Sequence, residues 1–335
     1  MGWRGFELIA AAWGCSAALI LVMLPMFRRY ALARPNARSS HKIPTPQGGG
    51  LAVILAVLIA LGANALVIGP ELTVRGEVLP LGAAVVLLTV VGAIDDIFPL
   101  SPKLRLGIQA VAVAFTVLTM PEELRALPIL PVTVERAAEI LTGLWFVNLV
   151  NFMDGIDWMT VAETVPSTAC LFLFGLFGAA PAPVGPVALA LCGAVLGFAP
   201  FNRPTAKLFL GDVGSLPIGL LLFWLLLQLA GSGHLAAAML LPLYYVADAT
   251  ITLLRRLARG EHITEAHRSH FYQLAVIRGL PVLTVVQWVC AVNIALAVLA
   301  ALSIWLSSTW FDLAALAGGG TLVAALLVMM ERGKR

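Results

Sequence analysis

The sequence predicts an all-α protein that crosses a membrane many times and forms a single domain over residues 1–335. Two observations support this fold class. Hydrophobic residues make up 60% of the 335 residues and charged residues only 12%, whereas soluble domains are about 25% charged. The apolar residues are also gathered in long runs, and a run of about 20 residues is what a helix needs to cross the hydrocarbon of a bilayer.

Eleven apolar stretches are long enough to form membrane-spanning helices. They cover residues 6–27, 48–69, 79–97, 104–121, 136–153, 159–180, 183–201, 213–231, 234–254, 282–305 and 309–330. Ten spans is the alternative count, because Asn148 and Asn151 interrupt the stretch 136–153. The first stretch follows Arg4 as a signal peptide would, but its apolar run exceeds the about 7–15 residues usual there, so we expect a retained span.

The orientation follows from the placement of the basic residues. Connections on one side of the membrane hold 17 of the 21 Lys and Arg residues, and only Arg4, Arg75, Arg125 and Arg136 fall on the other side. Because basic residues accumulate on the cytoplasmic side, we expect the amino terminus outside and the carboxyl terminus in the cytoplasm. The cytoplasmic segments are then those near residues 28–50, 95–103, 148–158, 202–215 and 255–281.

The composition excludes two further kinds of site. The net charge is only +3 and no long basic run exists, so we expect no nucleic-acid partner. The four cysteines lie inside apolar stretches without paired spacing, which predicts neither a disulfide framework nor a thiolate metal site. They are Cys15, Cys170, Cys192 and Cys290.

Adjacent carboxylates follow the third apolar stretch. Asp95 and Asp96 come directly after the run that ends at Ile94. Charge at a membrane boundary is costly and usually functional, and paired carboxylates suit Mg²⁺, which bridges them to substrate phosphates. The alternative is that these acids end a helix and pair with Lys103 and Arg105.

Two further cytoplasmic segments carry oxygen-bearing side chains. In the first, four such residues recur every three positions, which places them on one face if the segment is helical; they are Asn148, Asn151, Asp154 and Asp157. In the second, Asp212 stands between glycines and follows Lys207 and Phe209. These groups could coordinate a ligand near the membrane surface, and in both segments the alternative is an ordinary helix cap.

The first and last cytoplasmic connections suit phosphate. The first ends in Gly48–Gly50 at a helix start, where backbone N–H groups can bind an anion; the alternative is that its basic residues face the leaflet and its glycines pack helices. The last contains His267, Arg268 and His270. These side chains are donors for phosphate oxygens, and no Cys or third His completes a zinc site. A solvated basic loop is the alternative there.

Taken together and in this order, the five motifs resemble those of the polyprenyl-phosphate N-acetylhexosamine-1-phosphate transferases, glycosyl transferase family 4, including the branch that initiates O-antigen and related polysaccharides of the cell surface. The resemblance covers residues 34–281. It implies transfer of sugar 1-phosphate from a UDP-N-acetylhexosamine to the membrane lipid undecaprenyl phosphate, with release of UMP, at the cytoplasmic face of the inner (plasma) membrane. It also implies Mg²⁺, with Mn²⁺ as a substitute.

The resemblance assigns roles to individual residues. The catalytic group is Asp95, Asp96 and Asp212, with Asp212 and Asn151 at the metal and Asp95 as the residue that would accept a proton from the lipid phosphate. The residues assigned to the nucleotide are Asn148, Asp154, Asp157, Asn202 and Phe209. The residues assigned to the diphosphate and sugar are Lys42, His267, Arg268 and His270.

Two departures from the family pattern bear on the substrate. Trp158 stands where the pattern Asp-Gly-x-Asp-Gly has its second glycine, which puts the Asp157 assignment in doubt. The sequence His267-Arg-Ser-His270 replaces the consecutive histidines of the phospho-muramoyl-pentapeptide transferases, so that substrate is disfavoured. A secondary transporter and a membrane phosphatase are the rival classes, and a homodimer is left open.

Overall fold

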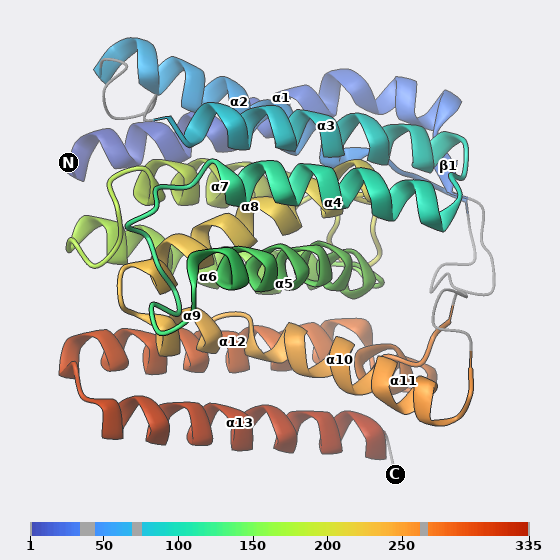
Figure 1. Cartoon of the computed structure of the whole chain (residues 1–335). Helices are drawn as coiled ribbons and strands as arrows, with labels where there is room; N and C mark the ends of the chain where they lie inside the picture. The colour runs from blue at the N-terminus through green and yellow to red at the C-terminus, as the bar shows by residue number, and fades with distance from the viewer. Residues whose placement is uncertain (1, 34–43, 69–75, 262–266, 334–335) are drawn as a thin grey trace.

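The computed structural model describes residues 2–33, 44–68, 76–261 and 267–333, and this part of the chain is almost entirely helical. The helices run side by side in one bundle (Figure 1). They are α1 (Gly2–Tyr30), α2 (Gly49–Ile68), α3 (Val78–Ile97), α4 (Pro102–Leu118), α5 (Val132–Met153), α6 (Met159–Leu176), α7 (Val184–Phe198), α8 (Asp212–Gly231), α9 (Leu235–Leu240), α10 (Leu243–Ala258), α11 (Phe271–Ile277), α12 (Val282–Leu306) and α13 (Thr309–Arg332). Two short strands, β1 (Leu32–Ala33) and β2 (Thr45–Pro46), pair antiparallel.

Each of the eleven predicted spans contains a helix, which confirms the all-α class and the multi-pass character of the protein. Within the described residues, seven helices are both long and apolar enough to cross a bilayer: α1, α2, α3, α6, α8, α12 and α13. The predicted stretch 234–254 is divided into α9 and α10 at Leu241 and Pro242. Proline lacks the N–H that a continuous helix would use. The number of crossings therefore stays a prediction.

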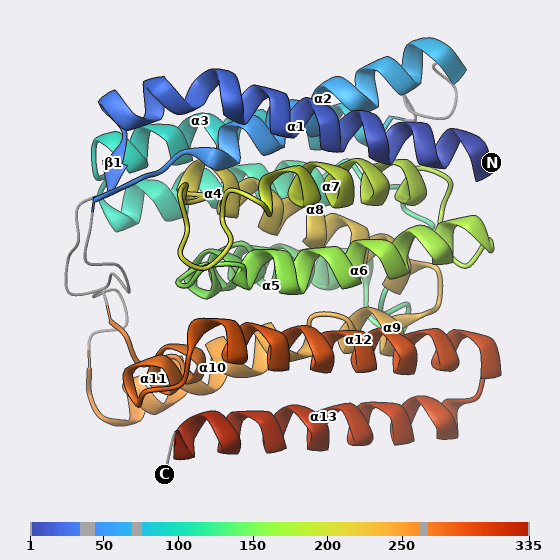
Figure 2. The same ribbon diagram turned by 180° about the vertical axis from the view of Figure 1, so that it is seen from behind.

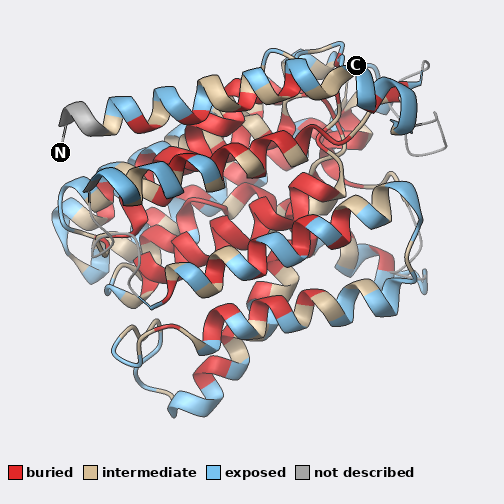
Figure 3. Ribbon diagram, turned by 90° about the horizontal axis from the view of Figure 1, so that it is seen from above, coloured by how far each residue is buried: buried red, intermediate tan, exposed pale blue. Residues whose placement is uncertain are grey.

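Helix α8 forms the centre of the bundle. It packs against α2, α3 and α5, and 94% of its most apolar 18-residue stretch is buried. The outer helices instead expose large apolar side chains, among them Val22 of α1, Trp305 of α12 and Leu313 of α13. Figure 3 shows this arrangement, with buried residues inside and exposed residues around the rim. An apolar exterior is what contact with lipid tails requires, because water would disfavour it.

The predicted cytoplasmic motifs lie at one end of the bundle, which we call the motif end: it carries Asp95, Asn151, Asn202, Asp212 and His270. Helices α3, α5, α7 and α10 end there, and α2, α4, α6, α8 and α12 begin there (Figures 1 and 2). Helix α1 begins at the far end and α13 finishes at the motif end, so the chain traverses the bundle an odd number of times. Which end faces the cytoplasm stays a prediction.

The start of α2 is used for packing. The N–H groups of Gly49 and Gly50 donate to the carbonyl oxygens of Phe209 and Leu210 at 2.9 and 2.8 Å. A Cβ atom on Gly50 would lie 2.1 Å from the Cα atom of Gly214. The glycines therefore allow α2 and α8 to touch, and these two N–H groups are not available to an anion. The prediction of an anion site at this helix start is wrong for this reason.

Candidate active site

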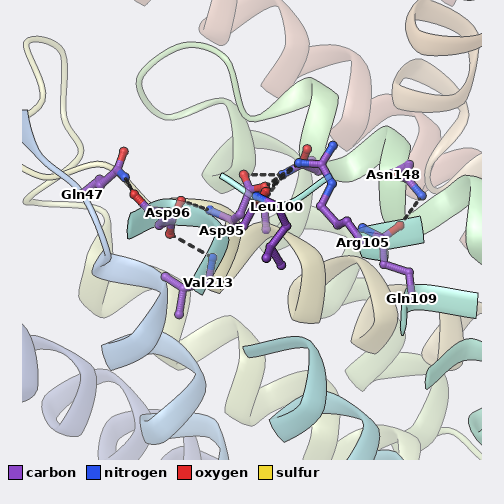
Figure 4. A network of polar contacts seen from close by, with 11 residues as sticks. Gln47, Asp95, Asp96, Leu100, Arg105, Gln109, Asn148 and Val213 are labelled. Carbon is purple, nitrogen blue, oxygen red and sulfur yellow. Dashed lines mark hydrogen bonds and ion pairs between the residues drawn. The ribbon is translucent and has the colours of Figure 1, made fainter. Parts of the chain in front are cut away.

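Three residues that the sequence predicted to act together converge at the motif end. Asp95 lies in the last turn of α3, Asn151 in the last turn of α5, and Asp212 is the first residue of α8. Arg105, from the first turns of α4, joins them: its Nη1 atom lies 2.7 Å from Asp95 Oδ2 and 3.2 Å from Asp212 Oδ2. We call Asp95, Arg105, Asn151 and Asp212 the carboxylate cluster. Figure 4 shows its Asp95–Arg105 side.

A tight turn brings Arg105 back over Asp95. Helix α3 ends at Ile97, and the N–H of Leu100 donates to Asp95 Oδ1 at 2.6 Å. Helix α4 then starts at once, because Ser101 is its N-cap and Pro102 its first residue. Proline suits this first position, where its missing N–H has no helical partner anyway. The turn thus fixes both carboxylate oxygens of Asp95, one to backbone and one to Arg105.

Asp96 points to the opposite side and holds the start of α8. Its two carboxylate oxygens accept the N–H groups of Asp212 and Val213 at 3.0 and 3.1 Å, and its carbonyl accepts from Gln47 at 2.9 Å (Figure 4). A carboxylate at a helix amino terminus satisfies free N–H groups and complements the helix dipole. Asp96 therefore positions Asp212, which agrees with a supporting role.

Asn151 orients Asp212 from the other side. Its amide nitrogen donates to Asp212 Oδ1 and to the hydroxyl oxygen of Ser215, both at 2.8 Å. The side chain of Asp212 is 26% exposed and that of Asp95 is 9% exposed. The two carboxylates are thus held in fixed orientations while Asp212 stays within reach of a ligand.

The donors of the carboxylate cluster fit a magnesium ion. One positive nitrogen already reaches oxygens of both Asp95 and Asp212, so a divalent cation placed between them would meet two carboxylates. In the described part of the chain, no three or more His, Cys, Asp or Glu side chains gather in a way that could hold a metal ion. Mg²⁺ can bind through only one or two carboxylates and take its other ligands from water and substrate phosphates, so the fit rests on Asp95 and Asp212 alone.

Asn148 lies apart from the cluster. It is buried between helices, and its amide nitrogen donates to Gln109 Oε1 of α4 and to the carbonyl of Leu144, both at 2.8 Å (Figure 4). Helix α5 ends at Met153, so the predicted common face does not extend to Asp154 and Asp157. The prediction of one shared face for the four residues is therefore wrong, because the helix stops before the last two.

Asp154 follows α5 directly and is half-buried. It accepts a hydrogen bond from the hydroxyl of Thr160. The pKa of Asp154 is raised to about 8, mainly because the group is buried; the Thr160 hydrogen bond opposes this rise, and the negative charge of Asp212 adds to it. A carboxyl group in this setting is mostly protonated at neutral pH, which limits repulsion with Asp212.

Asp157 and Asn202 fasten the connection between α7 and α8. Asp157 Oδ2 accepts the N–H of Ala206 at 2.9 Å. Asn202 Oδ1 accepts the N–H of Trp158 at 2.7 Å, and its amide donates to the carbonyl of Leu208 at 3.0 Å. Asp157 and Asn202 are both buried. They hold the connection that leads into α8 in one conformation.

Phe209 ends the same connection and is half-buried. Its N–H donates to Pro46 at 2.8 Å and its carbonyl accepts from Gly49 at 2.9 Å. Its backbone is thus fixed by the segment before α2, close to where α8 begins.

The last motif is organised by Asp248, a buried residue of α10 that the sequence did not single out. Its Oδ1 lies 3.2 Å from His270 Nδ1 and accepts the N–H of Phe271 at 3.0 Å, while its Oδ2 accepts the N–H of Tyr272 at 3.2 Å. His270 is only 2% exposed, so it supports the motif from within. The signal in the sequence was an aspartate in the otherwise apolar stretch before Arg255 and Arg256.

The other residues of this motif lie nearer the surface. His267 and Arg268 are half-buried, and the hydroxyl of Ser269 lies 2.8 Å from His267 Nδ1. The rings of His267 and His270 stand 4.9 Å apart. Lys42, which the sequence assigned to the phosphates, lies outside the described residues.

Comparison with known proteins places the chain among membrane transferases. A model of "Glycosyl transferase family 4" matches residues 78–230. A probable undecaprenyl-phosphate N-acetylglucosaminyl 1-phosphate transferase of Bacillus subtilis is 27% identical over 318 residues, 89% of this chain and 87% of that protein. A decaprenyl-phosphate N-acetylglucosaminephosphotransferase of Mycobacterium leprae is 32% identical over 62% of this chain and 58% of its own. A phospho-N-acetylmuramoyl-pentapeptide-transferase of Symbiobacterium thermophilum is 30% identical over 60% of this chain and 67% of its own.

Proposed function

The chain belongs to glycosyl transferase family 4, the polyprenyl-phosphate N-acetylhexosamine-1-phosphate transferases, and from this we propose that it transfers N-acetylhexosamine 1-phosphate from a UDP-sugar to undecaprenyl phosphate. An oxygen of the lipid phosphate forms a bond to the sugar-bearing phosphorus of the donor, and the bond from that phosphorus to the bridging oxygen breaks. UMP leaves with the bridging oxygen. The product is a lipid-linked diphosphate sugar.

The observation that carries this proposal is the convergence of Asp95 and Asp212 on a single positive group. The reaction brings together two phosphates that repel each other, so its catalysis is mostly positioning and charge neutralisation. The second pKa of a phosphate monoester is about 6, so the lipid phosphate is already mainly dianionic at pH 7. Asp95 is therefore needed more for arranging charge than for removing a proton.

We propose Mg²⁺, replaceable by Mn²⁺, as the cofactor, held by Asp212 with Asn151 beside it. When bound there, the ion would neutralise the phosphates of the donor. Asp96 fixes the amino terminus of α8 and Asn151 fixes the carboxylate of Asp212, so both act before the donor arrives. Arg105 offers a positive charge to the same phosphates once Asp95 and Asp212 have another cation to contact.

The remaining residues divide between the two ends of the donor. The α7–α8 connection with Asn202 and Phe209, together with Asp154 and Asp157, forms the proposed side for the uracil nucleotide. His267 and Arg268, supported by the buried His270, form the proposed side for the diphosphate and sugar. Lys42 is proposed for the phosphates from its place in the sequence alone, and the position of Asn148 between α4 and α5 argues for an indirect role.

We also propose that the motif end faces the cytoplasm from the inner membrane. The support is that 17 of the 21 Lys and Arg residues belong to segments of this side, as the positive-inside tendency requires. A nucleotide sugar would then reach the site from water while the lipid phosphate reaches it from the leaflet. The product would initiate O-antigen or another polysaccharide of the cell surface.

One specific observation favours a second substrate. The Symbiobacterium thermophilum relative is named for phospho-N-acetylmuramoyl-pentapeptide, so a UDP-muramoyl-pentapeptide donor is the alternative. His267-Arg-Ser-His270 speaks against it, as does the length of alignment with the Bacillus subtilis relative. A transporter is disfavoured because the polar groups gather at one end of the bundle instead of near its middle, where transporters bind substrate.

The test is a transfer assay with purified protein, vesicles that contain undecaprenyl phosphate, Mg²⁺ and a panel of donors: UDP-N-acetylglucosamine, UDP-N-acetylgalactosamine, UDP-glucose and UDP-muramoyl-pentapeptide. We expect UMP and lipid-linked diphosphate sugar in equal amounts, and only with a UDP-N-acetylhexosamine. UMP release without the lipid would indicate a hydrolase and contradict the proposal. Use of the muramoyl donor alone would favour the alternative.

A further inference from the structure

Trp158 adopts a backbone conformation that L-amino acids usually avoid. It is the N-cap residue of α6, with φ 64° and ψ 1°. This left-handed region brings the Cβ atom close to the following carbonyl oxygen, and only glycine adopts it without strain. Within the described residues, Ser307 is the one other non-glycine residue with positive φ. A tryptophan at this position is therefore unfavourable for the backbone unless its side chain makes a compensating contact.

The compensating contact is with the end of α7. The indole N–H of Trp158 donates to the carbonyl oxygen of Ala199 at 2.7 Å. Ala199 is the C-cap residue of α7, and the last carbonyls of a helix have no partner within it. The indole ring also packs against the buried core. Any residue except proline at position 158 could supply the backbone N–H that Asn202 accepts, but the bond to Ala199 depends on the tryptophan side chain.

The segment that Trp158 holds is the connection 199–209. Its start is fixed by the indole at Ala199 and by the backbone of Trp158 at Asn202. Its middle is fixed by Asp157 at Ala206, and its end by the pairing of Phe209 with residues 46–49. This is the connection that carries Asn202 and Phe209, the two residues proposed to meet the nucleotide. At its first residue, the N–H of Ala199 still bonds to Val195 within α7 at 3.0 Å, and the indole bond holds the carbonyl from which the chain leaves the helix.

We propose that Trp158 is a positioning residue for the nucleotide half of the donor, an inference that rests on the proposed function. Its indole keeps the connection 199–209 in the conformation that accepts uridine phosphate. Without this bond, the connection samples other conformations, and apparent affinity falls by the fraction of time spent in the competent one. Because the effect precedes chemistry, it changes the Kd of UDP and the KM of the donor and leaves kcat at saturating donor nearly unchanged.

The experiment compares Trp158→Phe and Trp158→Gly with the wild-type chain in lipid nanodiscs. Binding of UDP is measured by calorimetry with Mg²⁺, the exchange of amide hydrogens in 199–209 is measured without nucleotide, and KM and kcat are measured with undecaprenyl phosphate. We expect Trp158→Phe, which keeps an aromatic ring but is smaller and has no N–H donor, to raise the Kd of UDP by about five-fold, or about 1 kcal/mol, the size of one hydrogen bond. Trp158→Gly should raise it further, with faster exchange in 199–209.

Trp145→Phe is the matched control. Trp145 is also half-buried and its indole N–H also donates a hydrogen bond, but to Thr250 of α10 at 3.3 Å and not to the connection 199–209. We expect this variant to bind UDP like the wild type.

Trp158→Gly also removes backbone strain, so its unfolding temperature should fall less than the loss of a buried ring would imply.

Two outcomes overturn the inference. If Trp158→Phe and Trp158→Gly bind UDP with the wild-type Kd, the indole does not prepare the nucleotide side. If kcat falls as much as binding does, Trp158 acts on the chemical step instead. Absence of UDP binding by the wild-type chain would contradict the proposed function and this inference together, whereas wild-type binding with unaltered variants contradicts this inference alone.

Discussion

Arg105 holds two carboxylates together that would otherwise repel each other. Its guanidinium contacts both Asp95 and Asp212. All three side chains are largely buried, with 26% of Arg105, 26% of Asp212 and 9% of Asp95 exposed. Arg105→Ala should therefore destabilise the protein when Mg²⁺ is removed, by roughly 1.5–2 kcal/mol, the lower part of the range for hydrogen bonds to charged groups. Mg²⁺ should restore more stability to this variant than it gives to the wild type, because ligands that bind only the folded state stabilise it.

The measurement is the unfolding temperature with EDTA and with Mg²⁺. Arg105→Lys is the control, because it keeps the positive charge and loses only the shape of the guanidinium. If Mg²⁺ raises the unfolding temperature of the wild type and of Arg105→Ala by the same amount, the ion does not bind at the carboxylate cluster, and the proposed metal position is contradicted.

The two carboxylates of the cluster should differ in their effects. Asp212→Ala removes the proposed ligand of the ion, so we expect loss of turnover and of the Mg²⁺ shift while the chain stays folded. Asp95→Asn keeps the shape of the side chain and removes its charge. We expect it to lower kcat by about 100-fold or more, the size seen when one electrostatic group is lost, with little change in UDP binding. Equal losses in kcat and in binding would assign Asp95 to donor binding.

At the scale of an element, the start of α8 is where backbone geometry and the site meet. Gly211 precedes α8 with φ +80°, and a Cβ atom there would lie 2.4 Å from Asp96 Oδ2. Gly211→Ala should therefore displace Asp96 and the first turn of α8, and with it Asp212. We expect the transfer rate and the Mg²⁺ shift in unfolding temperature to be largely lost.

Gly178→Ala provides the control for backbone strain. Gly178 has φ +78°, but a Cβ atom there would meet nothing within 4 Å. Both substitutions place an alanine at positive φ, and at Gly211 the ψ of 169° lies in a region that is essentially restricted to glycine. Strain of this kind costs about 1–3 kcal/mol, and only Gly211→Ala adds the collision with Asp96. Similar transfer rates in the two variants would show that the cap by Asp96 does not control the site.

The bounds of a helix could be predicted from the sequence where they depend only on the length of an apolar run. The predicted stretches 79–97 and 213–231 differ from α3 and α8 by one residue at most, because the bilayer fixes the length of an apolar run. The break before α10 could not be predicted from hydropathy, since the residues on both sides of Pro242 are apolar. The predicted stretch 136–153 ends at Met153, as α5 does, but the three-residue spacing of the polar side chains suggested a helical face that continued to Asp157. Spacing alone does not show where a helix stops.

The sequence predicted which acidic and amide side chains form the site, but it did not predict most of the residues that contact them. Asp95, Asn151 and Asp212 were expected together because each lies near the end or start of an apolar stretch on the same side and because the family resemblance assigns all three to one site. Arg105 was considered only as an ion-pair partner of the first pair of acids. Its second contact, with Asp212, joins residues 107 positions apart, and such a pairing arises from the packing of α3, α4 and α8. The role of Asp248 was hidden for the same reason.

The whole molecule has two chemically different ends. The motif end carries the carboxylate cluster, the α7–α8 connection and the Asp248 network, while the connection from α4 to α5 lies at the other end (Figures 1 and 2). Exposed residues are available at both: Glu122 follows α4, and Arg259 follows α10. A cysteine at each position, in a chain without its four native cysteines, reports which end faces the cytoplasm.

We expect Glu122→Cys to react with a membrane-impermeant maleimide on intact cells, and Arg259→Cys to react only after the cells are opened. The physical reason is that basic residues remain on the cytoplasmic side during insertion, and the motif end holds most of them. Transfer activity of both variants confirms that the labelled protein is folded. Labelling of Arg259→Cys on intact cells, with Glu122→Cys protected, would place the carboxylate cluster outside the cell, where the proposed nucleotide-sugar donor of the cytoplasm could not reach it.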